Sequence, residues 1–342
     1  MLRLVFFIGL LSKAAFGQYP APTNRNVKPP AGKAPLKTVV QFPPEVWIEN
    51  IAARSNGHLL CNQLLPKAAL IEVSNPLDPS PYARVVHEFP PSISGLTGIC
   101  EPSKDSFVVV GYRFAKVGDS AEGSAESYSV NFNNGAYNKG PLIRRIGKHP
   151  DMVFPNGLAA LPGVDDVVLV ADSTLGLVWR LYLESGKTEV AIKVPEMALH
   201  PGTRLKIGVN GIKVINGYLW WSNSYVGEFY RVKIDKLGNK LGYPELMYRY
   251  ENYFIDDFAF DERGIWGTTN QNNTVMFASS GGEIYDVAGA QDSPDVAADT
   301  SCVFGRTAGV DDKILFVATG NTPKKGRGAK VVAVDTSTIY WP

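Results

Sequence analysis

Cysteine is scarce in this chain, with three residues, Cys61, Cys100 and Cys302, among 342. Three thiols allow at most one disulfide, so the chain is not a disulfide scaffold and has to rely on a hydrophobic core. We interpret the three residues as buried free thiols that act as small apolar side chains.

An excess of one charge sign is also missing. The chain has 34 basic and 33 acidic residues, and its formal net charge is +1. No positive excess is left to neutralise phosphates, so we expect no binding to nucleic acid. The hydrophobic fraction is 45%, which can bury a core and excludes a disordered chain.

Several motifs of known chemistry are absent. The chain contains no G-x-S-x-G elbow, no glycine-rich phosphate loop and no dinucleotide fingerprint, which excludes serine-hydrolase, kinase and nicotinamide chemistry and any nucleotide cofactor. Zinc is not expected because the four histidines do not have metal-ligand spacing. They are His58, His87, His149 and His200.

The N-terminus carries a short apolar run, Leu4 to Leu11, after Arg3 and before Ala15-Phe16-Gly17. This pattern predicts a secretory signal peptide over residues 1–17. The run is far shorter than the ~20 residues of a membrane-spanning helix, so we expect a secreted monomer without membrane contact.

Two further segments have a simple interpretation. Residues 18–36 are rich in Pro, Ala, Asn and Lys without periodicity, which predicts a linker. Asn272-Asn273-Thr274 is a glycosylation sequon, which places a candidate glycan on Asn272.

Beyond the linker, long stretches of helical periodicity are missing, and β-branched and aromatic runs of five to eight residues alternate with turn residues. The chain is therefore expected to be all-β. A unit that begins with a polar residue, a small or polar neighbour and an apolar residue recurs at intervals of 44 to 59 residues. The six units begin at Glu49, Thr97, Asn156, Asn210, Asp256 and Thr300.

Each unit contains four short strands, as in residues 157–161, 167–171, 177–183 and 188–194 of the third. Four strands per unit predict a six-bladed β-propeller over residues 37–342. The sixth unit is one strand short, and the segment Lys37 to Phe42 can complete it and close the ring.

The geometry of a propeller turns this repeat into a candidate site. The innermost strands run parallel around the axis, so the six residues that begin them converge at one end of the central channel. Two carboxylates and two amides among them offer the oxygen ligands that suit Ca²⁺ or Mg²⁺. Alternatively, these polar residues only fill a wet channel through their own hydrogen bonds.

The loops at the same end of the propeller are expected to form the mouth of a pocket. They are rich in aromatic residues, which favours a large apolar or aromatic small-molecule ligand. The loop from Gly111 to Glu126 is long enough to be a candidate lid. The candidate substrate-binding residues are Trp47, Tyr112, Phe154, Asn223, Tyr225 and Phe254.

The chain resembles the gluconolactonase, regucalcin and phosphotriesterase-like group of six-bladed propellers. The resemblance rests on Phe154-Pro155-Asn156-Gly157-Leu158, Ala171-Asp172-Ser173 and Thr300-Ser301-Cys302-Val303-Phe304-Gly305. It implies a metal site at Glu49, Asn156, Asn210 and Asp256, with Asp256 as base or nucleophile of a lactonase or esterase.

The chain departs from the hydrolases of this group at two positions, because Asn50 and Asp257 stand where those enzymes have Gly. The segment Trp47 to Ile51, with Arg54-Ser55-Asn56-Gly57, resembles a fungal secondary-metabolite branch. That branch includes hetero-Diels–Alderases, which join a tropolone-type quinone methide to a terpene alkene.

Three functions therefore stand side by side. The preferred one is a cyclase of the hetero-Diels–Alderase kind, in which Thr97 and Thr300 would hydrogen-bond the heterodiene. The second is a divalent-metal-dependent lactonase or esterase that uses Asp256. The third is a propeller that binds another protein without catalysis.

Overall fold

The computed structural model describes residues 32–116, 119–133, 140–203, 205–322 and 326–339. The expected signal peptide and residues 18–31 of the expected linker lie outside this part. Within it, no helix is long and apolar enough to cross a lipid bilayer.

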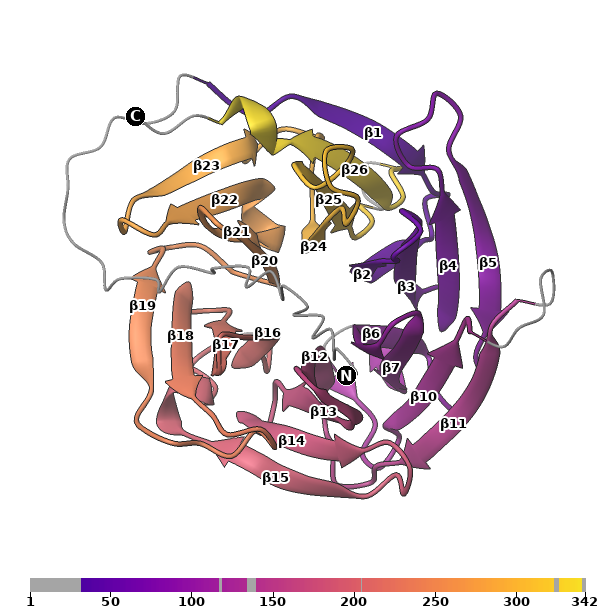
Figure 1. Ribbon diagram of the computed structural model, residues 1–342, viewed down its shortest axis with the longest axis vertical. Helices are drawn as coiled ribbons and strands as arrows, with labels where there is room; N and C mark the ends of the chain where they lie inside the picture. Colours follow the sequence, from indigo (N-terminus) through magenta and orange to yellow (C-terminus); the bar gives the residue numbers. More distant parts are fainter. Residues whose placement is uncertain (1–31, 117–118, 134–139, 204, 323–325, 340–342) are drawn as a thin grey trace, which may run out of the picture.

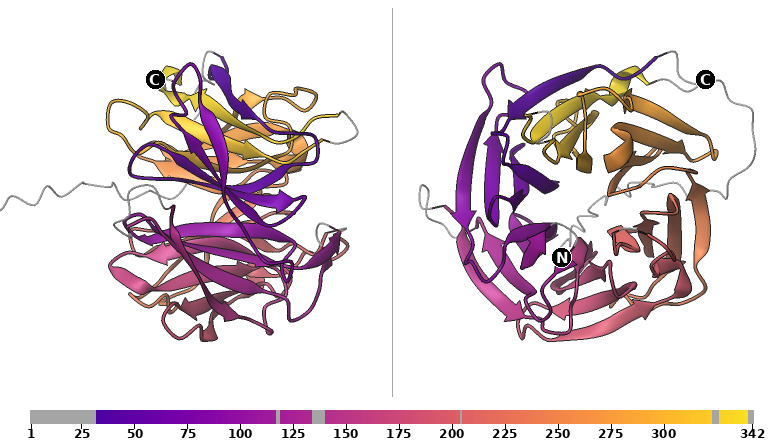
Figure 2. Two further views of the ribbon diagram at one scale, coloured as in Figure 1. Left: turned by 90° about the vertical axis from the view of Figure 1, so that its right-hand side faces the viewer. Right: turned by 180° about the vertical axis from the view of Figure 1, so that it is seen from behind.

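Six four-stranded antiparallel sheets surround a central channel, so the expected six-bladed propeller is confirmed (Figure 1). Figure 2 shows the same sheets edge-on and from behind. The innermost strands are β2 (Trp47–Ala53), β6 (Gly95–Ser103), β12 (Pro155–Leu161), β16 (Val209–Ile215), β20 (Phe258–Asp261) and β24 (Asp299–Phe304).

The other strands follow outward within each blade. Blade 1 adds β3 (Leu59–Leu65), β4 (Ala69–Ser74) and β5 (Tyr82–Glu88), and blade 2 adds β7 (Ser106–Tyr112), β10 (Glu126–Asn131) and β11 (Leu142–Lys148). Blade 3 adds β13 (Val164–Asp172), β14 (Leu177–Tyr182) and β15 (Thr188–Lys193), and blade 4 adds β17 (Tyr218–Asn223), β18 (Glu228–Lys233) and β19 (Glu245–Arg249). Blade 5 adds β21 (Gly264–Thr268), β22 (Thr274–Ser279) and β23 (Ile284–Gly289), and blade 6 adds β25 (Ile314–Thr319) and β26 (Lys330–Asp335).

Short elements interrupt this pattern. The 3-10 helices are η1 (Pro195–Met197), η2 (Asn270–Asn272) and η4 (Thr336–Thr338). The expected lid loop contains a small hairpin of β8 (Phe114–Lys116) and β9 (Asp119–Ser120).

The ring closes as the sequence predicts. Strand β1 (Leu36–Gln41) pairs antiparallel with β26, for example Leu36 with Val334, and so forms the outer strand of blade 6. This strand begins one residue earlier than expected. Ala34 also donates its backbone N–H to Val287 O of blade 5 at 2.7 Å, so the end of the expected linker already packs on the propeller.

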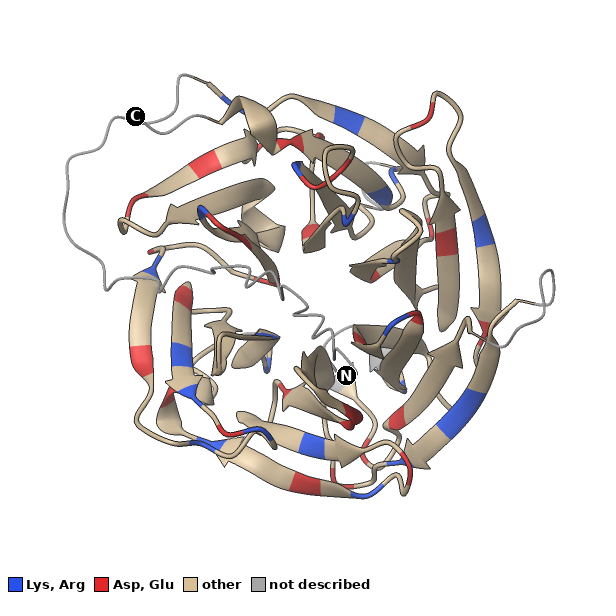
Figure 3. Cartoon of the chain, in the orientation of Figure 1, with Lys and Arg blue, Asp and Glu red and all other residues tan. Residues whose placement is uncertain are grey.

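The hydrophobic core lies between the blades. The buried apolar residues of the described chain form six clusters, and each cluster combines side chains of two adjacent blades. All three cysteines are free and buried, as expected. Lys and Arg are interspersed with Asp and Glu over the molecule (Figure 3), in keeping with the small net charge.

Each junction between neighbouring blades also carries a polar link. A side chain of one blade donates a hydrogen bond to a backbone carbonyl at the start of the next innermost strand, and we call these the junction hydrogen bonds. They are Asn62 Nδ2 to Thr97 O (3.1 Å), Thr97 Oγ1 to Pro155 O (2.8 Å), Ser173 Oγ to Val209 O (2.7 Å), Ser222 Oγ to Asp256 O (3.1 Å), Thr268 Oγ1 to Thr300 O (3.1 Å) and Thr300 Oγ1 to Ile48 O (2.8 Å).

Thr97→Val tests the junction hydrogen bonds. Valine keeps the shape of threonine but leaves Pro155 O without its donor, and an unsatisfied buried group costs about 1–3 kcal/mol. We expect the free energy of unfolding in urea to fall by that amount. Thr38→Val, at an exposed position of β1, is the control and should stay within about 0.5 kcal/mol of the wild type. Equal stability of both variants would show that the junction hydrogen bonds contribute nothing.

Candidate functional site

The four candidate metal ligands line one cavity in the central channel, with a volume of about 60 Å³. Glu49, Asn156 and Asn210 lie on β2, β12 and β16, and Asp256 comes two residues before β20. We call this the upper cavity. Its lining is Trp47, Glu49, Phe154, Asn156, Leu205, Ile207, Asn210, Phe254, Asp256, Asn270 and Gln271.

Two serines orient the asparagines. Asn156 Nδ2 donates to Ser173 Oγ at 3.2 Å, and Asn210 Nδ2 donates to Ser224 Oγ at 3.0 Å. Each serine follows the last residue of its blade's second strand, so the arrangement repeats in blades 3 and 4. With the amide nitrogens used in this way, the side-chain carbonyl oxygens remain as possible ligands.

Asp256 is held by two amides. Asn210 Nδ2 donates to its Oδ1 at 2.7 Å, and Asn270 Nδ2 donates to its Oδ2 at 2.8 Å. Asn270 begins η2, and the preceding residue, Thr269, donates its backbone N–H to Asp299 Oδ2 at 3.0 Å. Asn270 is not among the site residues predicted from the sequence. Its only signal was a polar Asn-Gln-Asn run that follows a strand.

The two carboxyl groups share a poorly solvated environment. Burial raises the pKa of Glu49 to about 7, although Trp47 Nε1 donates to Glu49 Oε2 at 2.6 Å and opposes the shift. Burial and the negative charge of Glu49 raise the pKa of Asp256 well above its ordinary value. Within the described chain, neither group forms an ion pair. A cavity with two unpaired carboxylates and two amide oxygens has the donor chemistry of a Ca²⁺ or Mg²⁺ site.

A polar layer closes the inner end of the upper cavity. Three of its members, Asn50, Asp257 and Ser301, directly follow the site residues of blades 1, 5 and 6. Ser301 Oγ lies 2.9 Å from Asn50 Oδ1 and 2.7 Å from Asp257 Oδ2. Lys213 Nζ of β16 donates to Asp257 Oδ1 at 2.6 Å. We call Asn50, Ser301, Asp257 and Lys213 the polar layer.

The other three blades have glycine at the same position, where a side chain would collide with the next blade. Gly98, Gly157 and Gly211 occupy the equivalent positions of blades 2, 3 and 4. A Cβ on Gly211 would lie 2.3 Å from Asp257 Oδ1, and one on Gly98 would lie 2.1 Å from Asn156 O. Asn50 and Asp257, which stand where glycine is found in blades 2 to 4, therefore place two acceptor oxygens around the Ser301 hydroxyl.

Three of the expected aromatic residues, Trp47, Phe154 and Phe254, line the upper cavity. Tyr225 packs against Phe254, with ring centroids 5.2 Å apart, and accepts a hydrogen bond from Leu205 N. Tyr112 packs against Phe154, with ring centroids 4.9 Å apart, and is only 1% exposed.

Three expected site residues have other roles in the structure. The hydroxyls of Thr97 and Thr300 form junction hydrogen bonds, so they are not directed at a ligand. Asn223 Nδ2 donates to Glu196 O and Ala198 O near η1. The expectation that Thr97 and Thr300 face a substrate does not fit this geometry.

Asn272 of the sequon belongs to η2, next to cavity residues Asn270 and Gln271. Its Oδ1 accepts the backbone N–H of Phe254 at 3.2 Å. The sequon therefore lies at the rim of the upper cavity.

Asp172 positions the loop that carries Phe154. It is fully buried, and its oxygens accept the backbone N–H groups of Val153, Phe154 and Leu175 and the indole N–H of Trp179. This carboxylate therefore acts on the cavity through Phe154 and does not line it.

No family model matches the chain. A protein of Sarocladium schorii named "Putative hetero-Diels-Alderase asR5" is 30% identical over 347 aligned positions, which cover 90% of this chain and 85% of that protein. A protein of Phoma sp. named "Putative hetero-Diels-Alderase" is 31% identical over 327 positions, which cover 88% and 90%.

The fold has relatives among solved structures. The calcium-binding protein regucalcin of Agrobacterium tumefaciens superposes with a TM-score of 0.59 at 15% identity, over 91% of this chain and 97% of that one. The chain therefore shares the propeller fold of this regucalcin.

Asp172→Asn tests how the cavity wall is held. Each carboxylate oxygen accepts two of the four N–H groups, so an amide that keeps one acceptor oxygen leaves two of them without a partner, at a cost of about 1–3 kcal/mol for each one that is buried. We expect a lower midpoint of thermal unfolding. Asp165→Asn, exposed on the same strand, should leave it unchanged. A midpoint equal to that of the wild type in Asp172→Asn would contradict the role of this carboxylate.

Proposed function

The chain belongs to the family of the two proteins named hetero-Diels-Alderases in Sarocladium schorii and Phoma, and we propose that it catalyses a hetero-Diels–Alder cyclisation of a small molecule. The observation that supports this most directly is the identity of 30% across nine-tenths of the chain. We further propose that the substrates are a tropolone-type quinone methide and a terpene alkene.

Such a cyclisation has modest chemical requirements. The heterodiene and the alkene form one carbon–carbon and one carbon–oxygen bond while the remaining double bond shifts, and no atom or proton is lost. Catalysis therefore consists of holding the partners in a reactive conformer, excluding water and hydrogen-bonding the heterodiene oxygen. No nucleophile is needed.

The upper cavity supplies these elements. Trp47, Phe154 and Phe254 present ring surfaces to a hydrocarbon partner. Gln271 lines the same cavity, and its side-chain amide donates to no group among the described residues, so it takes the donor role expected of Thr97 and Thr300. The cavity volume of about 60 Å³ is below the ~300 Å³ of typical ligand sites, so the cyclase function requires the cavity to widen when substrates bind.

The donor set of the upper cavity supports a second candidate, a divalent-metal-dependent lactonase or esterase. Glu49, Asn156, Asn210 and Asp256 would hold Ca²⁺ or Mg²⁺, which when bound would polarise a carbonyl oxygen. The observation that favours this alternative is that four oxygen ligands converge on one cavity with no cationic side chain on either carboxylate.

Trp47→Ala and Asp256→Asn separate the two functions. For the cyclase, loss of the Trp47 ring removes one wall of the cavity and should lower the rate and the stereoisomer excess of the adduct, the rate by about one to two orders of magnitude. Asp256→Asn should leave both largely intact. The measurement is chiral chromatography of the adduct formed from a quinone-methide precursor and a terpene alkene.

Two controls accompany this comparison. Trp47→Phe keeps an aromatic wall and should retain most of the stereoisomer excess, and Tyr243→Ala removes an aromatic side chain that is 89% exposed. If Asp256→Asn loses hydrolysis of an aromatic lactone and Trp47→Ala forms the adduct unchanged, the cyclase function is wrong and the hydrolase function is supported.

Calcium binding can be tested without any substrate. If the four ligands bind Ca²⁺, a concentration of 100 times Kd should stabilise the fold by about 2.7 kcal/mol, seen as a higher midpoint of thermal unfolding than in chelator. Asp256→Asn should abolish this difference, whereas Asp151→Asn, in an exposed loop, should retain it. Identical midpoints of thermal unfolding with calcium and with chelator in the wild type would show that these four residues do not bind calcium.

A further inference from the structure

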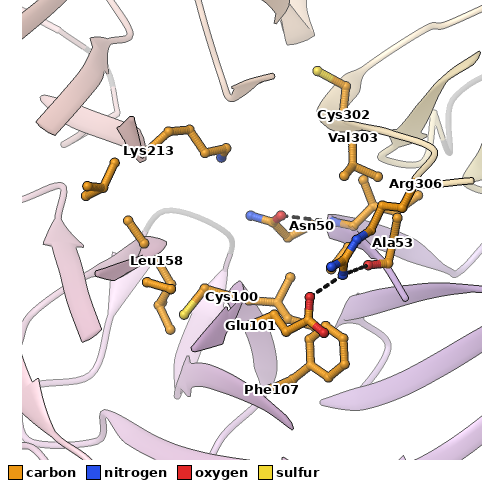
Figure 4. Close-up of a pocket in the computed structure, with 16 residues that line it drawn as sticks. Asn50, Ala53, Cys100, Glu101, Phe107, Leu158, Lys213, Cys302, Val303 and Arg306 are labelled. Atoms are coloured by element: carbon orange, nitrogen blue, oxygen red, sulfur yellow. Dashed lines mark hydrogen bonds and ion pairs between the residues drawn. The ribbon is translucent and has the colours of Figure 1, made fainter. Parts of the chain in front are cut away.

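A second cavity, of about 320 Å³, lies further along the central channel (Figure 4). Strand β2 shows its position, because Trp47 and Glu49 line the upper cavity while Asn50 to Ala53 line the second one. On β16, Asn210 lines the upper cavity and Lys213 the second. The polar layer therefore separates the two, and we call the second the lower cavity.

The walls of the lower cavity are mostly apolar. Ile99, Phe107, Leu158 and Val303 contribute hydrocarbon surface from blades 2, 3 and 6. Its volume falls at the lower end of the ~300–1,000 Å³ range of small-molecule sites. An apolar ligand of two fused rings can therefore enter without rearrangement of the wall.

Two hydrogen-bond donors face the interior of this cavity. Figure 4 shows the Lys213 ammonium and the Asn50 amide nitrogen pointing from opposite sides toward the middle of the channel. Asn50 Oδ1 is used by Ile51 N at 2.9 Å and by Ser301, which leaves its amide N–H groups for a ligand. Among the described residues, the Lys213 ammonium donates a hydrogen bond to Asp257 and lies 5.3 Å from the centroid of the Phe258 ring, and an ammonium carries three N–H groups.

The charges that line the lower cavity are already paired. Lys213 is balanced by Asp257. At the rim, Arg306 Nη1 pairs with Glu101 and donates to Ala53 O at 3.1 Å. An anionic ligand would therefore meet no free cation, whereas a neutral carbonyl oxygen would meet two donors.

We propose that the lower cavity is a second small-molecule site, which binds a mostly apolar, neutral ketone, quinone or lactone through a carbonyl oxygen placed between Lys213 and Asn50. The site is separate from the proposed cyclisation in the upper cavity. The apolar rings of the ligand lie against Leu158 and Phe107, and burial of this surface supplies most of the affinity.

The test uses the neutral naphthyl ketone 6-propionyl-2-dimethylaminonaphthalene, whose fluorescence moves to longer wavelength when its carbonyl accepts a hydrogen bond. We expect saturable binding to the wild type. Ala160→Phe fills the lower cavity and should weaken Kd at least about tenfold, the loss that about 1.4 kcal/mol produces. Ala308→Phe, on an exposed turn, is the matched control and should keep the wild-type Kd.

Lys213→Met tests the carbonyl contact itself. It should weaken Kd about tenfold, because a hydrogen bond from a charged donor to the ligand is lost. It should also move the bound emission to shorter wavelength, which a merely structural role of Lys213 would not do. Lys233→Met, exposed on β18 of the same blade, should change neither quantity.

Two results would overturn the proposal. One is unchanged affinity in a folded Ala160→Phe protein, which would place the ketone elsewhere. The other is equally tight binding of 2-naphthoate, which would show that the cavity does not select a neutral carbonyl compound over an anion. Circular dichroism establishes that each variant is folded. Because no cyclisation is measured, failure of this proposal and failure of the proposed function remain distinguishable.

Discussion

The structure of the site depends on the junction hydrogen bonds. Each one ends on a carbonyl of a site residue, as at Thr97 and Asp256, or of the residue directly before it, as at Ile48, Pro155 and Val209. The six apolar clusters supply most of the free energy that holds neighbouring blades together, but apolar packing is not directional. The junction hydrogen bonds are directional, so they set the position of each innermost strand along the channel axis relative to its neighbour.

This constraint explains why residues 44 to 59 positions apart in sequence line one small cavity. With the heights of the strands set, the residue after each site residue falls at a common level as well. Three consecutive blades, 2 to 4, have glycine there, and the polar residues of blades 5, 6 and 1 join into the layer that divides the channel. A cavity that contains two carboxyl groups and a mostly apolar cavity can therefore exist in one channel.

Much of the candidate site was accessible from the sequence. The repeat located Glu49, Asn156, Asn210 and Asp256 at the starts of the innermost strands, and all four line the upper cavity. The sequence also predicted aromatic residues at this end of the propeller, and three of them, Trp47, Phe154 and Phe254, line the same cavity. Thr97 and Thr300 were placed at the correct level, but their hydroxyls bind neighbouring backbone. A repeat gives the height of a residue along its strand and does not show which neighbour its side chain meets.

The sequence by itself determined the number of blades, the four strands in each, the closure by the N-terminal strand and the level of the site residues. These features follow from strand periodicity and repeat spacing, which are properties of one chain segment at a time. Only the tertiary structure decided that Asn270 holds Asp256, that Asn50, Ser301 and Asp257 meet across the channel, and that a second cavity lies beyond them. Those contacts join different blades, so their partners are known only when the ring is closed.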